Sequence, residues 1–364
     1  MISARAPERI LIVVTRRIGD VLLATPLMRS IKRAWPETQI DALVFEGTES
    51  VLHGNPDLAR ILTFPERPGF LAHAALLYKL WRRYDVALSL LSGDRPTLYA
   101  WVAGRHSLGL LIDHPSQAWK QRLLKQWLPF DALNTHTVRS YLALTTVLNI
   151  PALPAVVASW RNEDTAVVDA LLGKNCRPLA VLHTYPKFRY KMWHVSGWTE
   201  VAHWLLDQGF CVVLTGGRDA DERSYVTKIS QQVPKALNAT GLLSLGATAA
   251  LISRAAFYVG PDTAVTHLAA STGVPTIALF GPSDPVKWGP WPQQQPGSSN
   301  PWHRFGSQRA GNVQLIQARA ACVPCRLEGC ERHVGSGSDC LEGIPAKTVI
   351  QALRNQPLSS TPTT

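Results

Sequence analysis

The sequence contains no apolar run approaching the roughly 18 residues that a membrane-spanning helix requires. A signal peptide is also missing, because the apolar run Ile10–Val14 leads directly into Thr15-Arg16-Arg17. We therefore expect the protein to remain in the cytoplasm. The first predicted strand is not followed by G-x-G-x-x-G, and no P-loop lysine motif occurs. These absences argue against dinucleotide-binding and NTPase sites.

Cysteine is also scarce: six cysteines among 364 residues do not form a disulfide scaffold. Cys176 and Cys211 lie in apolar surroundings, which predicts two buried thiols. The remaining four are close together in the sequence: Cys322, Cys325, Cys330 and Cys340. Four nearby thiols can hold a structural zinc ion, but their x4 and x9 spacings fit no well-defined zinc finger. A flexible loop is the alternative interpretation.

Acidic residues are outnumbered by Lys and Arg, 26 to 37, and the net charge is +11. The partners that such a charge favours are nucleic acid, an anionic membrane surface or a phosphorylated substrate. No nucleic-acid-binding module is recognisable, so we expect no nucleic-acid partner. Basic residues alternate with Trp and Leu in Lys79–Arg83 and Trp119–Leu128. The second segment predicts a helix lying on anionic lipid or, alternatively, a solvated surface helix.

Chain length and composition predict two globular domains. Hydrophobic residues make up 46% of the chain and charged residues 17%, which excludes a disordered protein. Short apolar runs alternate with longer amphipathic stretches, the pattern of parallel strands joined by helices. The predicted strands are Arg9–Val14, Gln39–Phe45, Asp85–Leu90, Arg105–Leu110, Pro178–Leu182, Phe210–Thr215, Ala256–Val259 and Thr276–Phe280. The predicted helices are 21–34, 70–83, 116–128, 136–148, 163–172, 197–208, 219–231, 243–254 and 263–272.

The proline-containing segment 149–160 has no helical period and predicts a connector between the domains. We therefore predict an α/β protein with one domain at 1–150 and a second at 151–340. Residues 341–364 are expected to form a C-terminal helix and a tail that is disordered after Pro357. Two such domains place a ligand-sized cleft between the carboxyl ends of their sheets.

The loop after the first strand carries Arg17-Ile18-Gly19-Asp20. Loops at the carboxyl end of a parallel sheet face the ligand, so Asp20 is a candidate catalytic carboxylate. The structural alternative is that Asp20 caps a helix beginning at Val21, a common role of aspartate.

The segment from Val259 to Pro275 contains a second candidate site. Asp262 and Thr263 lie where a strand ends and a helix begins, and Gly273 ends that helix. Free backbone N–H groups and the helix dipole make such a position a diphosphate site. His267 falls one turn later on the face of Thr263, within reach of a phosphate. The alternative is a satisfied core histidine.

Two more loops end strands in this half: His183-Thr184-Tyr185, leading to Lys191, and Thr215–Asp221. Three loops that end three strands and carry hydroxyls, a lysine, paired glycines and acids together predict one binding site.

The sequence resembles glycosyltransferase family 9, the heptosyltransferases of lipopolysaccharide core assembly. The resemblance covers nearly the whole chain. The motifs that carry it are Arg17-Ile18-Gly19-Asp20 followed by Thr25-Pro26, Lys191-x-Trp193, Asp262-Thr263-Ala264-x-x-His267-Leu268-Ala269-Ala270, and Pro275-Thr276-x-x-Leu279-Phe280-Gly281-Pro282-Ser283. The segments Arg17–Pro36 and Phe45–Thr48 look most like heptosyltransferase III, which adds a third heptose to the second.

The resemblance implies a GT-B fold, in which two Rossmann-like domains with parallel sheets face a central cleft. It implies an inverting reaction that needs no metal and no cofactor. Asp20 matches the catalytic base of the family, and Arg16 and Arg17 are candidates for contacting acceptor phosphates. The positions that match donor-binding residues are Thr184, Lys191, Leu243, Asp262, Thr263, Ala264 and His267. A family glutamate that binds the donor ribose falls in a loop where this chain offers Asp219 and Asp221.

The implied reaction transfers heptose from ADP-heptose to the inner core of lipopolysaccharide. Asp20 would remove the acceptor proton, while Lys191 and the helix N-terminus at Asp262-Thr263 stabilise the leaving diphosphate. The acceptor is a membrane lipid, so a monomeric enzyme associated peripherally with the inner leaflet of the cytoplasmic membrane is expected, with Trp119–Leu128 as its main membrane contact and Lys79–Arg83 assisting. The alternatives are a family 9 transferase of another sugar, a GT-B nucleotide-sugar epimerase and a non-catalytic nucleotide-binding protein.

Overall fold

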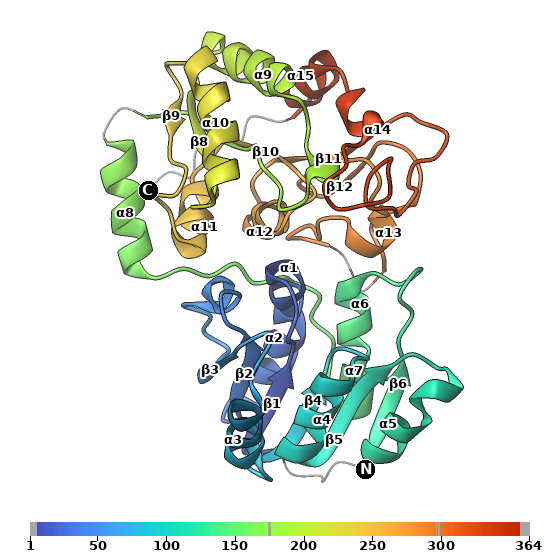
Figure 1. The fold of residues 1–364 in the computed structure, drawn as a ribbon. Helices are drawn as coiled ribbons and strands as arrows, with labels where there is room; N and C mark the ends of the chain where they lie inside the picture. Colours follow the sequence, from blue (N-terminus) through green and yellow to red (C-terminus); the bar gives the residue numbers. More distant parts are fainter. Residues whose placement is uncertain (1–5, 174–175, 296, 298, 357–364) are drawn as a thin grey trace. The chain divides into compact units, whose positions relative to one another are not determined.

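The computed structural model describes residues 6–173, 176–295, 297 and 299–356 (Figure 1). The chain divides into two compact units, Met1–Val157 together with Pro296–Asn300, and Ala158–Gln295 together with Pro301–Thr364. The division falls within the predicted connector, seven residues after the predicted boundary at 150. Residues 341–356 belong to the second unit instead of forming a separate segment. The predicted disordered tail lies outside the described residues.

The first unit contains a six-stranded parallel sheet in the order β3-β2-β1-β4-β5-β6. Its strands are β1 Arg9–Val13, β2 Gln39–Phe45, β3 Arg60–Phe64, β4 Tyr84–Ser89, β5 Gly104–Leu111 and β6 Gln126–Pro129. The central strand β1 is apolar and fully buried from Ile10 to Val13, as expected for a parallel strand covered by helices on both faces.

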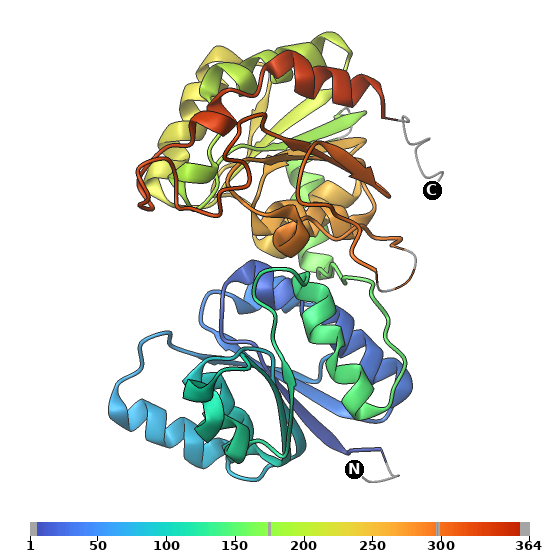
Figure 2. The same cartoon turned by 90° about the vertical axis from the view of Figure 1, so that its right-hand side faces the viewer.

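Helices cover both faces of this sheet (Figure 2). They are α1 Ile18–Leu22, α2 Thr25–Ala34, α3 Phe70–Leu80, α4 Asp94–Ala103, α5 Ala118–Leu123, α6 Thr137–Leu142 and α7 Leu144–Leu148, with 3-10 turns at Glu49–Leu52 and Pro115–Gln117. On one face α3 and α4 pack with Leu11, Val13 and Phe64 in a single core cluster. On the other, α2 packs against α6 and α7.

Three predicted helices of this unit were wrong in their extent. The helix predicted at 136–148 is divided at Ala143 into α6 and α7. The helix predicted at 21–34 is two helices, because Pro26 occupies the first turn of a new helix that begins at Thr25. The helix predicted at 116–128 ends at Leu123, and Gln126–Pro129 forms the edge strand β6 beside β5. The apolar side chains of Trp127 and Leu128 fit a half-buried strand equally well, so periodicity alone could not separate the two structures.

The second unit contains a seven-stranded sheet in the order β12-β13-β11-β10-β7-β8-β9. All pairs are parallel except β12 with β13. Its strands are β7 Leu179–His183, β8 Cys211–Thr215, β9 Leu237–Asn238, β10 Phe257–Pro261, β11 Thr276–Phe280, β12 Gln308–Ala310 and β13 Val313–Gln317.

The helices of the second unit are α8 Asn162–Leu172, α9 Val195–Asp207, α10 Ala220–Gln232, α11 Leu245–Ser253, α12 Ala264–Thr272, α13 Pro285–Trp288, α14 Asp339–Glu342 and α15 Ala346–Arg354, with a 3-10 turn at Arg189–Lys191. One core cluster contains Trp198 of α9 and Val349 of α15, and another contains Leu251 of α11 and Ala269 of α12. Within the described ranges of both units, none of the helices has the length and apolar character that a bilayer span requires.

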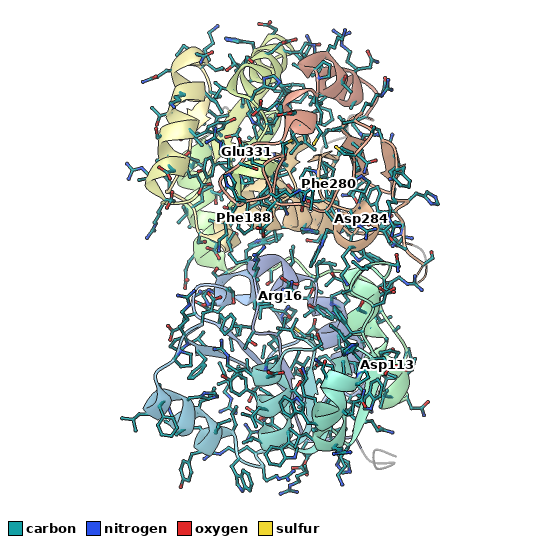
Figure 3. All side chains as sticks on the ribbon, turned by 45° about the vertical axis from the view of Figure 1, so that its right-hand side comes forward. Arg16, Asp113, Phe188, Phe280, Asp284 and Glu331 are labelled. Atoms are coloured by element: carbon teal, nitrogen blue, oxygen red, sulfur yellow. A yellow bond between two sulfur atoms is a disulfide. The ribbon has the colours of Figure 1, made fainter. Side chains whose placement is uncertain are left out.

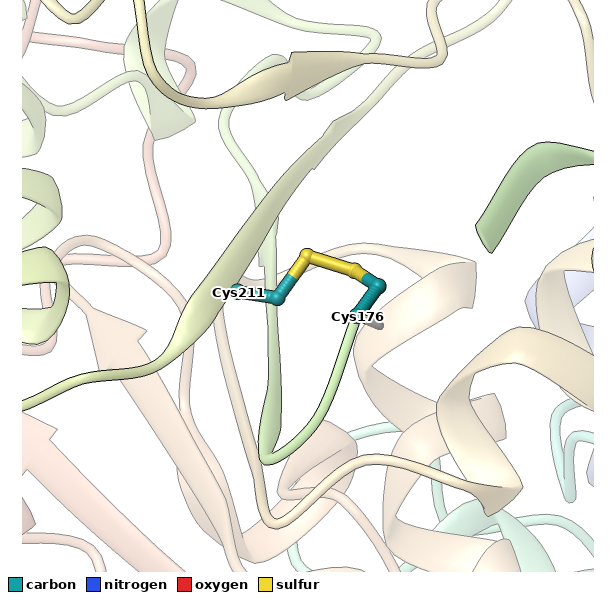
Figure 4. The surroundings of a disulfide bond; sticks show 2 residues. All are labelled: Cys176 and Cys211. Carbon is teal, nitrogen blue, oxygen red and sulfur yellow. A yellow bond between two sulfur atoms is a disulfide. The ribbon is translucent and has the colours of Figure 1, made fainter. Parts of the chain in front are cut away.

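Cys176 and Cys211 form a disulfide (Figure 4), so the prediction of two buried free thiols was wrong. Cys176 lies just before β7 and Cys211 begins the neighbouring strand β8, with 5.2 Å between their Cα atoms. That separation is within the usual range for a disulfide. The two cysteines are 35 residues apart in the sequence, and the pairing of β7 with β8, which composition cannot reveal, brings their thiols together.

Candidate functional site

The candidate donor site lies where the strand order of the second sheet reverses. The strands run outward from β7 to β8 and β9 on one side, and from β10 to β11 and β13 on the other. Loops that follow β7 and β10 are therefore expected to turn to opposite faces, and this topology predicts a crevice between them at the carboxyl end of the sheet. Leu182 pairs with Val259, so Thr184 and Asp262 leave the sheet from neighbouring strands.

A buried ion pair joins these two loops. Lys191 Nζ lies 2.5 Å from Asp262 Oδ2, and the Lys191 and Asp262 side chains are only 19% and 7% exposed. Burial alone would raise the pKa of Asp262, but Lys191, His267 and a hydrogen bond from Ser283 lower it overall. The carboxylate therefore stays ionised and holds the ammonium group of Lys191 in the crevice.

Helix α12 begins directly after this carboxylate. Thr263 is its N-cap, and the Thr263 side chain accepts a hydrogen bond from Thr266 N. Ala264 is the first helical residue, so its N–H group is directed out of the helix N-terminus together with the positive end of the dipole. An anionic ligand fits this position.

His267 lies one turn into α12, as the sequence predicts. Its Nε2 atom is 3.9 Å from Asp262 Oδ1, and the side chain is buried. Burial lowers the pKa of His267 to about 4, more than the attraction of Asp262 raises it. The imidazole is therefore neutral near pH 7, with one nitrogen as a donor and the other as an acceptor.

Two buried polar atoms in this crevice have no protein partner within the described residues: Thr184 Oγ1 and His267 Nδ1. Buried polar atoms are hydrogen-bonded in nearly all proteins, and a buried exception calls for an explanation. A polar ligand bound here would satisfy both atoms.

The close contact of β10 with α12 depends on Gly260, a residue that sequence analysis did not single out. A Cβ atom at Gly260 would come within 2.3 Å of Tyr258 Oη. That hydroxyl lies 2.9 Å from Thr266 Oγ1, which in turn donates to Pro261 O. This network fixes the turn that presents Asp262.

Glu222 is a further candidate residue that sequence analysis missed. Asp219 is the N-cap of α10 and accepts a hydrogen bond from Asp221 N, so its side chain has a structural role. The half-buried carboxylate of Glu222 instead lies against Gly216 and Gly217, at the end of β8. Burial raises the pKa of Glu222 more than the Gly217 backbone lowers it. Leu243, at the end of the next loop, packs against the core cluster that contains Leu251.

The candidate base lies in the first unit, at the carboxyl end of β1, where the strand order reverses toward β4. Helix α1 begins at Ile18 with Arg17 as its N-cap, so the alternative that Asp20 caps a helix beginning at Val21 was wrong. Asp20 is buried inside α1. Arg16, labelled in Figure 3, places its Nε atom 3.6 Å from Asp20 Oδ2. The pKa of buried Tyr141 responds to both charges. Burial raises this pKa most, the Asp20 carboxylate raises it further and the Arg16 guanidinium lowers it.

The four C-terminal cysteines do not form a recognisable metal site. Cys322 and Cys330 are exposed free thiols, while Cys325 and Cys340 are partly buried. No group of three or more His, Cys, Asp or Glu side chains in the described ranges is arranged to hold a metal ion. Burial raises the pKa of the Cys340 thiol to about 11, and the neighbouring Cys322, Cys325 and Cys330 raise it further. The geometry thus gives the predicted zinc site no support.

Known proteins are similar to this chain in sequence and in architecture. Residues 78–312 match the family described as glycosyltransferase family 9 (heptosyltransferase). The chain belongs to glycosyltransferase family 9. It is therefore an enzyme of the glycosyltransferase class.

Two family 9 structures and one curated heptosyltransferase illustrate the similarity. Lipopolysaccharide heptosyltransferase 3 of Escherichia coli is 27% identical over 288 residues, which cover 75% of this chain and 83% of the relative. The family 9 glycosyltransferase of Veillonella parvula superposes with a TM-score of 0.74 at 18% identity and covers 95% of this chain and 96% of its own. The E. coli heptosyltransferase WaaC, solved with ADP, superposes with a TM-score of 0.72 at 18% identity and covers 95% and 99%. The predicted architecture of two Rossmann-like domains is thereby confirmed.

Proposed function

We propose that this family 9 enzyme transfers heptose from ADP-heptose to the inner core of lipopolysaccharide. The observation that carries the donor assignment is the crevice between β7 and β10, with its α12 N-terminus, its ordered Lys191 and two buried polar atoms that lack partners. The names of the relatives support heptose as the sugar and lipopolysaccharide as the acceptor.

The diphosphate of the donor binds at the N-terminus of α12. The N–H group of Ala264 and the side chain of Thr263 contact phosphate oxygens, and Lys191 adds a charge-assisted hydrogen bond. Thr184 Oγ1 and His267 Nδ1 then gain a polar partner from the same ligand. This arrangement provides positive potential where charge develops on the leaving group, and we propose that the reaction needs no metal ion.

The adenosine of the donor extends from the phosphates toward the ends of β8 and the following loop. Glu222 is the proposed ribose ligand, since its carboxylate faces the paired glycines while Asp219 caps a helix. Leu243 packs against the adenine ring. A carboxylate that accepts two ribose hydroxyl protons as hydrogen bonds favours a nucleoside diphosphate over inorganic diphosphate.

Asp20 acts as the general base. It removes the proton from the acceptor hydroxyl as that oxygen attacks the anomeric carbon, the bond to the diphosphate breaks, and ADP leaves with the bonding electrons. Attack opposite the leaving group inverts the configuration at the anomeric carbon. Arg16 and Arg17 flank this carboxylate and contact phosphates of the acceptor. The similarity to heptosyltransferase 3 supports the third heptose as the sugar added.

The acceptor is a lipid, so the enzyme works in the cytoplasm at the inner face of the membrane, as a peripheral monomer. A single assay tests the proposal: the protein is incubated with ADP-heptose, with and without a delipidated inner-core acceptor, in the presence of EDTA. We expect acceptor-dependent release of ADP and a product one heptose heavier by mass spectrometry. ADP release without acceptor would contradict transfer to that acceptor, and loss of activity on chelation would contradict a metal-independent reaction. Transfer of a different sugar would contradict heptose as the sugar transferred.

A further inference from the structure

Helix α3 of the first unit exposes apolar side chains on the face that points away from the sheet. Phe70 is 85% exposed, Leu71 82% and Tyr78 84%, and Trp81 directly after the helix is 58% exposed. Positions 70, 71, 74, 75 and 78 fall on one side of a helix, and all five are apolar or aromatic and exposed. Figure 2 shows α3 projecting from the first unit.

The opposite face of α3 packs against the core of the first unit. Leu76 and Leu80 are buried in the core cluster with Tyr99, and Leu77 packs against that cluster. A helix that is apolar on every side is normally buried on every side. The outer face of α3 therefore lacks the packing partner that an apolar helix face normally has. Single exposed apolar residues are common on protein surfaces, but a continuous apolar patch of this kind marks an interaction site.

The charge around this patch is positive. Residues 66–83 contain four basic residues and one acidic residue, Glu66. Lys79 lies beside the patch, and Arg82 and Arg83 follow the helix as exposed side chains. The guanidinium of Arg82 stacks over the Trp81 ring at 5.6 Å. Aromatic and aliphatic side chains bordered by Lys and Arg are suited to the headgroup region of an anionic bilayer.

The segment Trp119–Leu128, predicted as the membrane contact, does not have this character. Lys120 is 2% exposed, pairs with Asp94 at 2.9 Å and donates to Ser92 O. The lysine thus stabilises the loop after β4 and cannot reach a lipid. Part of the remaining segment is the edge strand β6.

We propose that the outer face of α3, formed by Phe70, Leu71, Tyr78, Lys79, Trp81 and Arg83, binds the surface of an anionic phospholipid bilayer. This inference rests on the proposed function, because a lipid-borne acceptor requires the enzyme at a membrane. The apolar side chains enter the headgroup region, and the basic side chains contact phosphates. Binding by one helix face is reversible and weakens with salt.

Vesicle sedimentation tests the surface. The parent enzyme should bind vesicles of equal phosphatidylglycerol and phosphatidylcholine at low salt, and not vesicles of phosphatidylcholine alone. The variant Phe70→Ser/Leu71→Ser/Tyr78→Ser should lose about tenfold or more of the partition coefficient. Lys79→Glu/Arg83→Glu, which leaves the apolar face intact, should lose a similar factor. Matched controls are Leu133→Ser/Val167→Ser and Arg122→Glu/Lys125→Glu, exposed residues outside α3 that should retain parental binding.

Transfer to a delipidated acceptor separates this inference from the proposed function. If both α3 variants keep parental turnover there and lose vesicle binding, the surface is supported. Parental vesicle binding by these variants would overturn it even if heptose transfer is confirmed. Loss of a dimer in sedimentation velocity on substitution of α3 would also overturn it, since the occupant would then be a second copy. If the α3 variants lose vesicle binding but the enzyme proves to use another acceptor, the proposed function is refuted and the α3 surface is retained.

Discussion

The two units share the order of their parallel strands, apart from the added antiparallel strand β12, but differ in the chemistry of their switch points. In the second unit, the loops after β7 and β10 bring together a buried ion pair, a neutral histidine and a helix N-terminus. In the first unit, the first turn of α1, shortly after β1, presents one buried carboxylate, that of Asp20, with Arg16 Nε 3.6 Å away. The arrangement in the second unit suits the binding of an anion. The arrangement in the first unit suits the removal of a proton. The comparison teaches that the sheet decides where a site lies, while a few loop residues decide what it does.

The sharpest test of this division is Asp20→Asn. The amide keeps the size of the side chain but is a poor base, so kcat should fall by roughly 10²- to 10⁴-fold. The affinity for ADP, measured by calorimetry, should stay within about twofold, because the donor residues lie in the other unit. Asp113→Asn, an exposed loop residue after β5 (Figure 3), is the matched control and should keep parental kcat. A near-normal kcat for Asp20→Asn would remove Asp20 from catalysis.

Lys191→Ala should produce the converse result. Loss of a charge-assisted contact should weaken ADP binding by roughly 10- to 100-fold. It also leaves the buried carboxylate of Asp262 unpaired, so the second unit should lose about 3–5 kcal/mol of stability. Calorimetry and thermal unfolding measure the two effects. Arg189→Ala, an exposed residue of the same 3-10 turn, should change neither; an unchanged dissociation constant for Lys191→Ala would contradict the proposed donor site.

Acid should destabilise the second unit in particular. Burial lowers the pKa of both His183 and His267 from 6.5 to about 4. The unfolded chain therefore binds more protons than the folded chain between pH 6.5 and 4, and stability falls as the pH falls through that window. Each histidine contributes on the order of 2–3 kcal/mol at most. Urea unfolding of the parent and of His183→Asn at pH 7 and pH 5 should give a smaller pH-dependent loss for the variant. Equal losses would assign the acid sensitivity to other groups.

The smallest expected effect separates Glu222 from Asp219. Glu222→Gln should weaken ADP binding by about three- to tenfold, since a carboxylate accepts stronger hydrogen bonds from ribose hydroxyls than an amide does. Asp219→Asn should leave binding unchanged because asparagine caps helices as well as aspartate. The reverse pattern, in which only Asp219→Asn weakens binding, would make Asp219 the ribose ligand.

The sequence by itself determined the alternation of strands and helices, the connector between the units and the strand ends after which Asp20, Lys191 and Asp262 follow. Each of these depends on local properties: apolar runs long enough for a buried parallel strand, prolines that stop helices, and glycine at the end of α12. Thr184 and Asp262 could be placed at the carboxyl edge of the sheet from the sequence, because each directly follows a buried strand. Lys191 and His267 lie further along the chain, and the role of all four residues in donor binding stays a prediction.

Only the tertiary structure decided the features that depend on which side chains meet. Cys176 and Cys211 are joined because β7 lies beside β8. Glu222 faces Gly217 because α10 begins after its N-cap Asp219. Lys120 is buried and pairs with Asp94, which lies in the chain after β4. Residues 126–129 became a strand because the edge of β5 offered unpaired backbone groups. For the disulfide, Lys120 and residues 126–129, the deciding partner lies far away along the chain, so local sequence patterns could not identify it. Glu222 and Gly217 are close in sequence, but only the start of α10 decides which acidic side chain of this segment faces the glycines.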